Sequence, residues 1–259
     1  MNIVLITGAS SGIGKEFAEI YAKNKANLLL VARSGDKLKQ IAANLSSAYA
    51  IQADVFVKDL AEENAVEKLM SYINEKGYEV TDLINNAGFG DYGSIIETDW
   101  AKENSMIHVN VVTVVYLAKG IAKHMIDKNI KGKILNVGSI ASFMPNAHMS
   151  IYHATKAFVL SFSLGIREDL KRKGITVTTL CPGVTASGFQ ERANITKASF
   201  IKGGSMPTSK EVAEFGYKHL QRGSAVAIHG FKNRFLVFIM RFLSKTFVTA
   251  VAYRMSSND

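Results

Sequence analysis

The chain has 259 residues, of which 47% are hydrophobic and 20% charged, and its formal net charge at pH 7 is +9. This composition excludes a disordered chain, and the length suits one domain around a single core. No recognised DNA- or RNA-binding motif accompanies the positive charge, so no nucleic-acid partner is expected. The only cysteine, Cys181, cannot form an intramolecular disulfide, and no N-terminal targeting signal is found, so a cytoplasmic protein is expected.

Short apolar segments alternate along the chain with longer segments of helical periodicity. We expect strands at 3–7, 27–31, 49–52, 82–85, 133–137, 176–180 and 225–228. We expect amphipathic helices at 13–24, 35–46, 58–75, 103–128, 151–173 and 208–221. Strands separated by helices predict βαβ units. The expected fold is therefore a single α/β Rossmann domain over residues 1–259, a doubly wound parallel sheet of about seven strands with helices on both faces.

The first expected strand runs directly into a glycine-rich turn and then a helix. The turn reads Thr7-Gly8-Ala9-Ser10-Ser11-Gly12-Ile13-Gly14. Glycines permit a tight turn and a close approach of the backbone to a pyrophosphate, and the N–H groups that begin a helix favour an anion. This segment therefore predicts a dinucleotide-binding turn.

The glycine spacing resembles that of the short-chain dehydrogenase/reductase family, and further motifs follow in the family's order. Asn85-Asn86-Ala87-Gly88 ends the fourth strand, and Tyr152 and Lys156 have the spacing Tyr-x-x-x-Lys. Ser139 lies thirteen residues before Tyr152, and Pro182-Gly183 follows the sixth strand. The resemblance covers residues 1 to about 230. It implies an oxidoreductase that interconverts a carbonyl and an alcohol with a nicotinamide cofactor.

Ala32-Arg33 follows the second expected strand, at the place where an acidic residue would bind the ribose hydroxyls of NAD. A guanidinium can instead bind the extra phosphate, so NADP(H) is expected in preference to NAD(H). The resemblance implies contacts of Asp54 and Val55 with the adenine, and of Thr185 and Ser187 with the nicotinamide carboxamide. The full expected cofactor set is Gly8, Ser10, Ser11, Gly12, Ile13, Gly14, Arg33, Asp54, Val55, Asn86, Ala87, Gly88, Tyr152, Lys156, Pro182, Gly183, Thr185 and Ser187.

Tyr152 is the expected general acid and base at the carbonyl oxygen. Its ordinary pKa of about 10 leaves little phenolate at neutral pH, and Lys156, one helical turn later, can supply the stabilising positive charge. The resemblance implies that Lys156 also binds the nicotinamide ribose and that Ser139 holds the substrate oxygen. It implies further that Asn110 completes a water-linked proton path. The expected catalytic set is Asn110, Ser139, Tyr152 and Lys156.

The expected substrate-side residues, inferred by position, are mostly apolar. They are Phe89, Ala141, Phe143, Met144 and Phe189, with Ile140 and Met149 as either pocket or core residues. Such a lining suits a hydrophobic ketone or aldehyde better than a sugar, whose hydroxyls would be buried without partners. The six histidines show no paired ligand spacing, so no metal site is expected. His148 and His153 flank the tyrosine and are candidates for a substrate contact or for packing.

Two segments near the C-terminus are irregular or amphipathic. Residues 186–206 form either a lid over the nicotinamide or a mobile surface loop. In the tail at 234–255, Phe235, Phe238 and Phe242 recur at helical spacing with basic residues on another stripe. This tail is expected to pack on its own domain, near the substrate entrance or a subunit interface, or else to make a peripheral membrane contact.

The resemblance also implies a homodimer or homotetramer formed through the long helices at 103–128 and 151–173. The expected partner is otherwise a small-molecule carbonyl or alcohol. Two alternatives to an enzyme use the same fold: a non-catalytic NADP(H)-sensing module and a membrane- or nucleic-acid-associated scaffold. The complete set of four catalytic residues favours the enzyme, because a sensor has no need of all four.

Overall fold

The computed structural model describes residues 1–193, 195 and 206–256, and a seven-stranded parallel sheet runs through its centre. The sheet order is β3-β2-β1-β4-β5-β6-β7. The strands are β1 (Asn2–Thr7), β2 (Leu28–Ala32), β3 (Ala53–Val57), β4 (Glu79–Asn85), β5 (Lys133–Val137), β6 (Thr176–Cys181) and β7 (Val226–Ile228).

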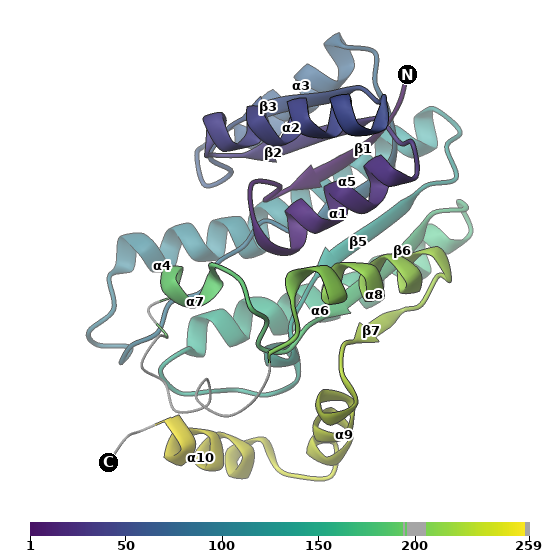
Figure 1. Cartoon of the computed structure of the whole chain (residues 1–259). Coiled ribbons are helices and arrows are strands. Elements are labelled where there is room, and N and C mark those ends of the chain that lie inside the picture. The colour runs from purple at the N-terminus through teal and green to yellow at the C-terminus, as the bar shows by residue number, and fades with distance from the viewer. Residues whose placement is uncertain (194, 196–205, 257–259) are drawn as a thin grey trace.

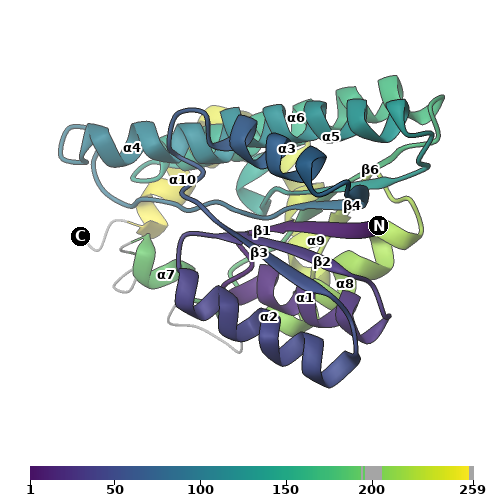
Figure 2. The same ribbon diagram turned by 90° about the horizontal axis from the view of Figure 1, so that it is seen from above.

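Helices cover both faces of this sheet (Figure 1 and Figure 2). One face carries α1 (Gly12–Lys23), α2 (Gly35–Tyr49) and α8 (Ser209–Gln221). The other carries α3 (Ala65–Glu75), α5 (Val114–Asp127) and α6 (Ser150–Lys171). Two short helices, η2 (Ile140–Phe143) and α7 (Phe189–Arg192), follow the ends of β5 and β6. This is the doubly wound fold that the alternation of strands and helices predicts.

Strands β1 and β2 consist mainly of buried aliphatic residues, because helices exclude water from both faces of the sheet. In the parallel register, Leu5 of β1 lies opposite Leu29 of β2 and Leu83 of β4. Phe17 of α1 fills the core on one side of the sheet and Leu117 of α5 fills it on the other, and both are completely buried. The two core layers hold the strand ends, and hence the loops beyond them, in fixed positions.

The strand order reverses at β1, which pairs with β2 on one side and β4 on the other. In open α/β sheets, ligands bind beyond the carboxyl ends of the strands at such a point. The Thr7 hydroxyl joins the two strand ends, since it accepts hydrogen bonds from the backbone N–H groups of Asn86 and Ala87, each at 3.0 Å. The glycine turn and the segment at 85–88 therefore start side by side.

Two predicted elements differ from the structure: the third strand is displaced, and the helix expected at 58–75 begins only at Ala65. A strand is expected at 49–52, but α2 continues to Tyr49 and the third strand runs over 53–57. A short apolar stretch of this kind does not distinguish a helix end from a buried strand. The helix expected at 103–128 is confirmed as one continuous helical segment, Trp100–Asp127, made of α4 (Trp100–Ile107), the π-helix η1 (His108–Thr113) and α5.

The segment Trp100–Asp127 is long and apolar enough to cross a membrane by length and composition. Half of its most hydrophobic window is buried inside the domain, because α5 packs against the sheet. Burial of this kind is typical of a core helix.

After β7 the chain leaves the sheet and forms α9 (Phe231–Met240) and α10 (Lys245–Ser256) in place of the single helix expected at 234–255. Both lie beyond the β7 edge of the sheet (Figure 1). Asn233 of α9 packs directly on Gly183, where an added Cβ would lie 2.4 Å from its Nδ2. The tail thus packs on its own domain, at the carboxyl ends of the strands.

Candidate active site

A cleft with a volume of about 600 Å³ opens at the carboxyl ends of the strands. It brings together most of the residues predicted from the sequence. Those that line it are Gly8, Ser10, Ser11, Gly12, Ile13, Arg33, Asn86, Ala87, Gly88, Phe89, Ser139, Ile140, Ala141, Met144, Met149, Tyr152, His153, Lys156, Pro182, Gly183, Thr185, Ser187 and Phe189. Gly8 of the glycine turn and Tyr152 are 144 residues apart in the sequence. They nevertheless line one cleft.

The turn after β1 has the shape that a dinucleotide pyrophosphate requires. Gly12 adopts φ +55° and faces the cleft, where an added Cβ would meet nothing closer than Ser187 at 3.5 Å. The first turn of α1 carries no acidic side chain, so the positive end of the helix dipole favours an anion there. The prediction for Gly14 is corrected, because this residue does not line the cleft. A Cβ on it would lie 2.4 Å from the Gly8 carbonyl oxygen, so glycine is needed there for packing.

The predicted adenine contacts of Asp54 and Val55 are also corrected, because neither residue lines the cleft. Both lie within β3, and the Asp54 carboxylate accepts hydrogen bonds from the hydroxyls of Tyr72 (2.5 Å) and Tyr78 (2.7 Å). The residues that line the cleft after β3 are Lys58, Asp59 and Leu60. The error follows from the misplaced third strand, whose true end lies five residues later than the sequence analysis expects.

Arg33 lies just beyond the end of β2, and its guanidinium is 3.3 Å from the Asp59 carboxylate. Both side chains are substantially exposed, so this ion pair contributes little to stability. Lys58 lines the same part of the cleft and pairs with Glu62. This end of the cleft therefore holds two cations in weak surface pairs, which can rearrange around an anionic ligand.

Tyr152 and Lys156 lie on successive turns of α6, and both are buried. The Lys156 Nζ lies 5.8 Å from the centroid of the Tyr152 ring and donates a hydrogen bond to the Val137 carbonyl at 2.8 Å. Burial raises the pKa of Tyr152 to about 12, against the opposing effect of the Ser139 hydroxyl. Burial also lowers the pKa of Lys156 to about 8. At neutral pH the phenol is protonated and the lysine is mostly cationic.

Ser139 follows β5 and caps η2. Its Oγ accepts a hydrogen bond from the Ala141 N–H at 3.1 Å and donates one to the Pro182 carbonyl at 3.5 Å. The Ser139 N–H donates to the Ser142 hydroxyl, which in turn donates to the Lys156 carbonyl at 2.7 Å. This network ties the end of β5 to α6 and fixes Ser139 beside the tyrosine.

Asn110 lies in the π-helical segment η1 and is completely buried behind the cleft. Its Nδ2 donates to the Phe89 carbonyl at 2.9 Å and to the Thr155 hydroxyl at 3.1 Å, and its Oδ1 accepts from the Phe89 N–H at 3.2 Å. A Cβ on Gly88 would lie 2.9 Å from the Asn110 Oδ1 and 3.4 Å from the Lys156 Nζ. The amide and the ammonium thus approach each other across this glycine. π-Helical turns are frequent at functional sites.

The substrate end of the cleft is apolar. The Phe189 and Tyr152 rings lie 5.4 Å apart, between centroids. Phe143 is a third correction, because it does not line the cleft; the single tight turn of η2 directs Ile140 and Ala141 there instead. His153 lines the cleft with its Nδ1 2.8 Å from the Met144 carbonyl oxygen, and burial lowers the pKa of its imidazole.

The tail supplies lining residues that the sequence analysis did not assign to the cleft. Leu236, Met240 and Leu243 are spaced at four and three residues and face the cleft together, which an apolar stripe at this spacing could have indicated. The lining residues of α10 are Phe247, Val248, Val251 and Ala252. Tyr253 stacks on His148 with centroids 5.4 Å apart, so α10 is held against the loop that precedes α6.

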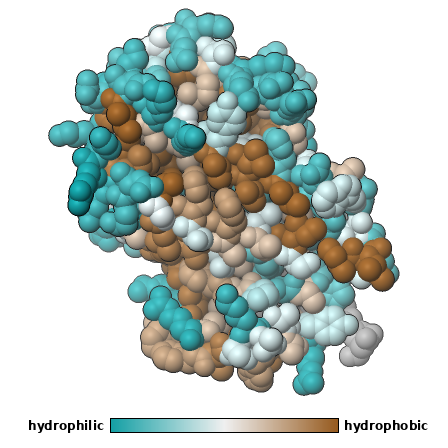
Figure 3. Space-filling model, turned by 180° about the vertical axis from the view of Figure 1, so that it is seen from behind, coloured by the Kyte–Doolittle hydropathy of each residue, from teal (hydrophilic) through white to brown (hydrophobic). Residues whose placement is uncertain are grey.

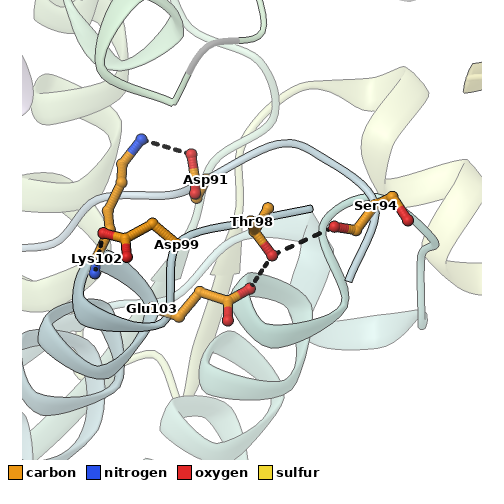
Figure 4. Close-up of polar contacts among 6 residues, drawn as sticks. All are labelled: Asp91, Ser94, Thr98, Asp99, Lys102 and Glu103. Atoms are coloured by element: carbon orange, nitrogen blue, oxygen red, sulfur yellow. Dashed lines mark hydrogen bonds and ion pairs between the residues drawn. The ribbon is translucent and has the colours of Figure 1, made fainter. Parts of the chain in front are cut away.

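A polar cluster fixes the loop between β4 and α4 (Figure 4), and the first residues of this loop, 86–89, line the cleft. Lys102 pairs with the buried Asp91, and the Asp99 carboxylate accepts a hydrogen bond from the Lys102 N–H at 3.1 Å. The Thr98 hydroxyl donates to the buried Glu103 carboxylate at 2.5 Å. Every acidic group drawn in Figure 4 has a partner, so we assign this cluster a structural role.

The hypothesis of a lid at 186–206 falls mainly on residues 194 and 196–205, which lie outside the described part of the chain. Within the described part, the Phe189 N–H donates to the Ser187 hydroxyl at 3.3 Å. The Thr185 hydroxyl donates to the Gly183 carbonyl at 3.0 Å. The lid therefore stays a prediction.

Several known proteins are similar to this chain in sequence. A family model described as short chain dehydrogenase matches residues 2–198. The very-long-chain 3-oxoacyl-CoA reductase of Anas platyrhynchos is 32% identical over 203 residues, which are 76% of this chain and 63% of that protein. The sulfoacetaldehyde reductase 2 of Chromohalobacter salexigens is 32% identical over 189 residues, 73% of this chain and 74% of that protein. The chain thus spans about three fifths of the length of the very-long-chain reductases it matches.

Solved structures share the whole architecture. A short-chain dehydrogenase from Sphingobium yanoikuyae in complex with NADPH has a TM-score of 0.83 and 30% identity, covering 93% of this chain and 94% of that one. The bulky-bulky ketone specific alcohol dehydrogenase from Comamonas testosteroni has a TM-score of 0.78 and 29% identity, covering 93% and 92%. The family match spans both the glycine turn and the buried tyrosine–lysine pair. The chain belongs to the short-chain dehydrogenase family of oxidoreductases, which use a nicotinamide cofactor.

Proposed function

We propose that this protein is an NADP(H)-dependent oxidoreductase that interconverts a hydrophobic ketone or aldehyde and the corresponding alcohol. The observation that carries the proposal is the arrangement of one cleft. Its apolar end holds the buried Tyr152 and Lys156, and its other end holds the glycine turn and Arg33. The glycine at position 12, with its open approach to the backbone, fits a dinucleotide.

The proposed chemistry assigns a role to each catalytic residue. When bound, NADP(H) supplies or takes up the hydride at the substrate carbon. In the reductive direction, the hydroxyls of Ser139 and Tyr152 donate hydrogen bonds to the carbonyl oxygen, and Tyr152 transfers its proton as negative charge develops there. The Lys156 ammonium stabilises the phenolate that remains. Asn110 holds the backbone of Phe89 at the cleft and keeps its amide near the lysine.

The preference for NADP(H) is supported by Arg33, which lies where NAD-specific enzymes need an acidic residue. A phosphate dianion on the adenosine ribose can draw the guanidinium away from its weak pair with Asp59. A fluorescence titration tests this preference. NADPH should bind at least about tenfold more tightly than NADH, and Arg33→Ala should reduce that ratio while Arg222→Ala leaves it unchanged. Equal dissociation constants in the unaltered protein would contradict the preference.

The hydrophobic substrate is supported by the lining of the cleft, which α9 and α10 extend with aliphatic and aromatic side chains. Relatives whose names specify long acyl or bulky ketone substrates agree with such a lining. The decisive assay measures NADPH consumption with a panel of aliphatic, aromatic, acyl-thioester and steroid ketones and aldehydes. Turnover should rise with the apolar surface of the substrate. NADPH binding without turnover of any member would favour the non-catalytic sensor instead.

We further propose a homodimer or homotetramer. The outer face of α5 and α6 exposes large apolar side chains, which gather across the centre of the surface in Figure 3. They are Tyr116, Phe158 and Leu164, together with Val112 of the adjoining η1. Exposed apolar patches of this kind are typical of subunit interfaces.

A further inference from the structure

Helix α9 and the turn that follows it present a row of four phenylalanines to solvent. Phe231, Phe235 and Phe238 lie on one side of α9, and Phe242, two residues past its end, contacts Phe238 with ring centroids 5.3 Å apart. Their exposed fractions are 82%, 57%, 52% and 73%. Single exposed apolar residues are common on protein surfaces, but a contiguous row marks an interaction site.

The active site does not use this row of phenylalanines. The side of α9 that faces the cleft consists of Leu236, Met240 and Leu243, and none of the four phenylalanines lines the cleft. The helix is therefore apolar on two sides. One side lines the active-site cleft, and the other is exposed to solvent.

Positive charge accompanies the phenylalanines. Arg234 and Arg241 border a second, shallow apolar groove of about 360 Å³ that Phe231, Phe235 and Phe238 also line. From position 230 to 256 the chain contains five basic residues and no aspartate or glutamate, and the only acidic residue that follows in the sequence is Asp259. The basic residues are Lys232, Arg234, Arg241, Lys245 and Arg254. A surface that combines exposed aromatic rings with unopposed cations is complementary to an anionic interface with an apolar interior.

We infer that the surface formed by α9 and the start of α10 docks on an anionic phospholipid bilayer. The phenylalanine rings would enter the region between headgroups and acyl chains, and the long basic side chains would reach the phosphates. A second copy of this chain fits the surface less well. A two-fold contact would bring the same arginines together, and this segment offers no carboxylate to pair with them.

This docking extends the proposed function, because the same two helices line the substrate end of the cleft. Apolar atoms also gather at the lower edge of Figure 3, where α9 lies. A hydrophobic carbonyl compound dissolved in the bilayer would then enter the cleft without crossing water. Vesicle binding needs no turnover, so it can fail or succeed independently of the proposed reaction.

Flotation of the full chain with vesicles tests the inference. The protein should float with vesicles of equal parts phosphatidylcholine and phosphatidylglycerol, and its partition coefficient should fall at least about tenfold as salt screens the charges. Phe231→Gln with Phe242→Gln should lower it by at least about tenfold. Arg234→Gln with Arg241→Gln should lower it on anionic vesicles only. The matched control, Lys37→Gln with Lys39→Gln, removes two exposed cations from α2 and should bind as the unaltered protein does.

A conservative variant distinguishes loss of membrane binding from loss of folding. Phe242→Trp retains an aromatic ring and should bind vesicles as the unaltered protein does. The emission of the introduced tryptophan should shift to shorter wavelength on vesicles, whereas the unaltered protein, whose only tryptophan is Trp100, should show no such shift. Three results would overturn the inference: no flotation of the unaltered protein at low salt, equal loss of binding in the α2 control, or a phenylalanine variant that dissociates an oligomer in sedimentation. The last result would assign the surface to a contact between copies of the chain.

Discussion

At the scale of single residues, the charge states of Tyr152 and Lys156 decide what the site can do. Burial raises the pKa of the phenol to about 12 and lowers that of the ammonium to about 8. A protonated phenol donates to a carbonyl oxygen without prior ionisation, so the pair suits reduction at neutral pH. The buried thiol of Cys181 does not compete, because burial raises its pKa to about 12 and keeps it protonated.

Tyr152→Phe should abolish the proton transfer and little else. The rate of carbonyl reduction should fall by about 10² to 10⁴, the usual contribution of a positioned general acid. NADPH affinity should change by less than about twofold, because the ring and the lysine remain. Steady-state kinetics and a fluorescence titration measure the two quantities. Tyr49→Phe, at the end of α2 and outside the cleft lining, is the control, and unchanged turnover in Tyr152→Phe would remove the proposed mechanism.

Reduction should slow as the pH rises through about 8. Lys156 has a folded-state pKa below its ordinary value, so its ammonium is present below pH 8 and is lost above it. Tyr152 stays protonated throughout this range. The profile of kcat/KM should therefore be level below pH 8 and fall tenfold per pH unit above it. Lys156→Arg, if it retains activity, should remove this descent, and a level profile up to pH 10 in the unaltered enzyme would show that the lysine charge is not required.

At the scale of elements, small backbone features aim the functional groups. The turn after β1 needs Gly14 because the Gly8 carbonyl oxygen occupies the space of a side chain. The π-helical turn η1 widens the long helix and turns Asn110 toward Phe89 and Thr155. Hydrogen bonds between the start of η2 and α6 hold Ser139 at the end of β5.

Two glycine substitutions should have opposite effects on stability. Gly14→Ala places a Cβ 2.4 Å from backbone and should destabilise the protein by about 1–3 kcal/mol, the usual cost of overpacking. Gly165→Ala, inside α6 with nothing within 4 Å, should stabilise it by about 0.5–1 kcal/mol through helix propensity. Urea denaturation measures both changes. Equal effects of the two substitutions would contradict this account of the turn.

At the scale of the whole molecule, two apolar surfaces remain outside the core, on different elements. The face of α5 and α6 extends across the domain, whereas the phenylalanine row lies on α9 beyond the β7 edge. The helices of the first surface carry carboxylates as well as cations, such as Asp127 beside Lys123, whereas α9 and α10 carry arginines and lysines and no carboxylate side chain. This difference in charge supports separate roles, a subunit interface for the first and a lipid surface for the second.

Phe158→Lys tests the subunit interface. Phe158 stacks on Phe162 with centroids 6.0 Å apart and is 43% exposed, so a charge there would be buried in an α6-mediated contact. Sedimentation velocity should show a dimer or tetramer for the unaltered protein and at least a tenfold weaker association for the variant. Vesicle binding per chain should persist. A monomer in the unaltered protein at micromolar concentration would contradict the oligomer.

The sequence alone determined the fold class and most of the site. Alternating apolar and amphipathic segments predict the parallel sheet, because period and segment length report burial directly. The glycine turn could be placed from its position between a strand and a helix, and Asn86, Ser139, Tyr152 and Lys156 from the resemblance of their ordered motifs to the short-chain dehydrogenase family. Both kinds of pattern are found along the chain and need no knowledge of contacts in space.

Only the tertiary structure decided the rest, because those features depend on groups far apart in the chain. Asp59, not Asp54, lines the cleft, because α2 extends further than its pattern indicates and moves the third strand end. The side chain of Asn110, in the π-helical segment, finds its partners on the backbone of Phe89, 21 residues earlier in the chain. The two apolar sides of the tail could be told apart only once the sheet had placed α9 over Gly183, with one side in the cleft and the other in solvent.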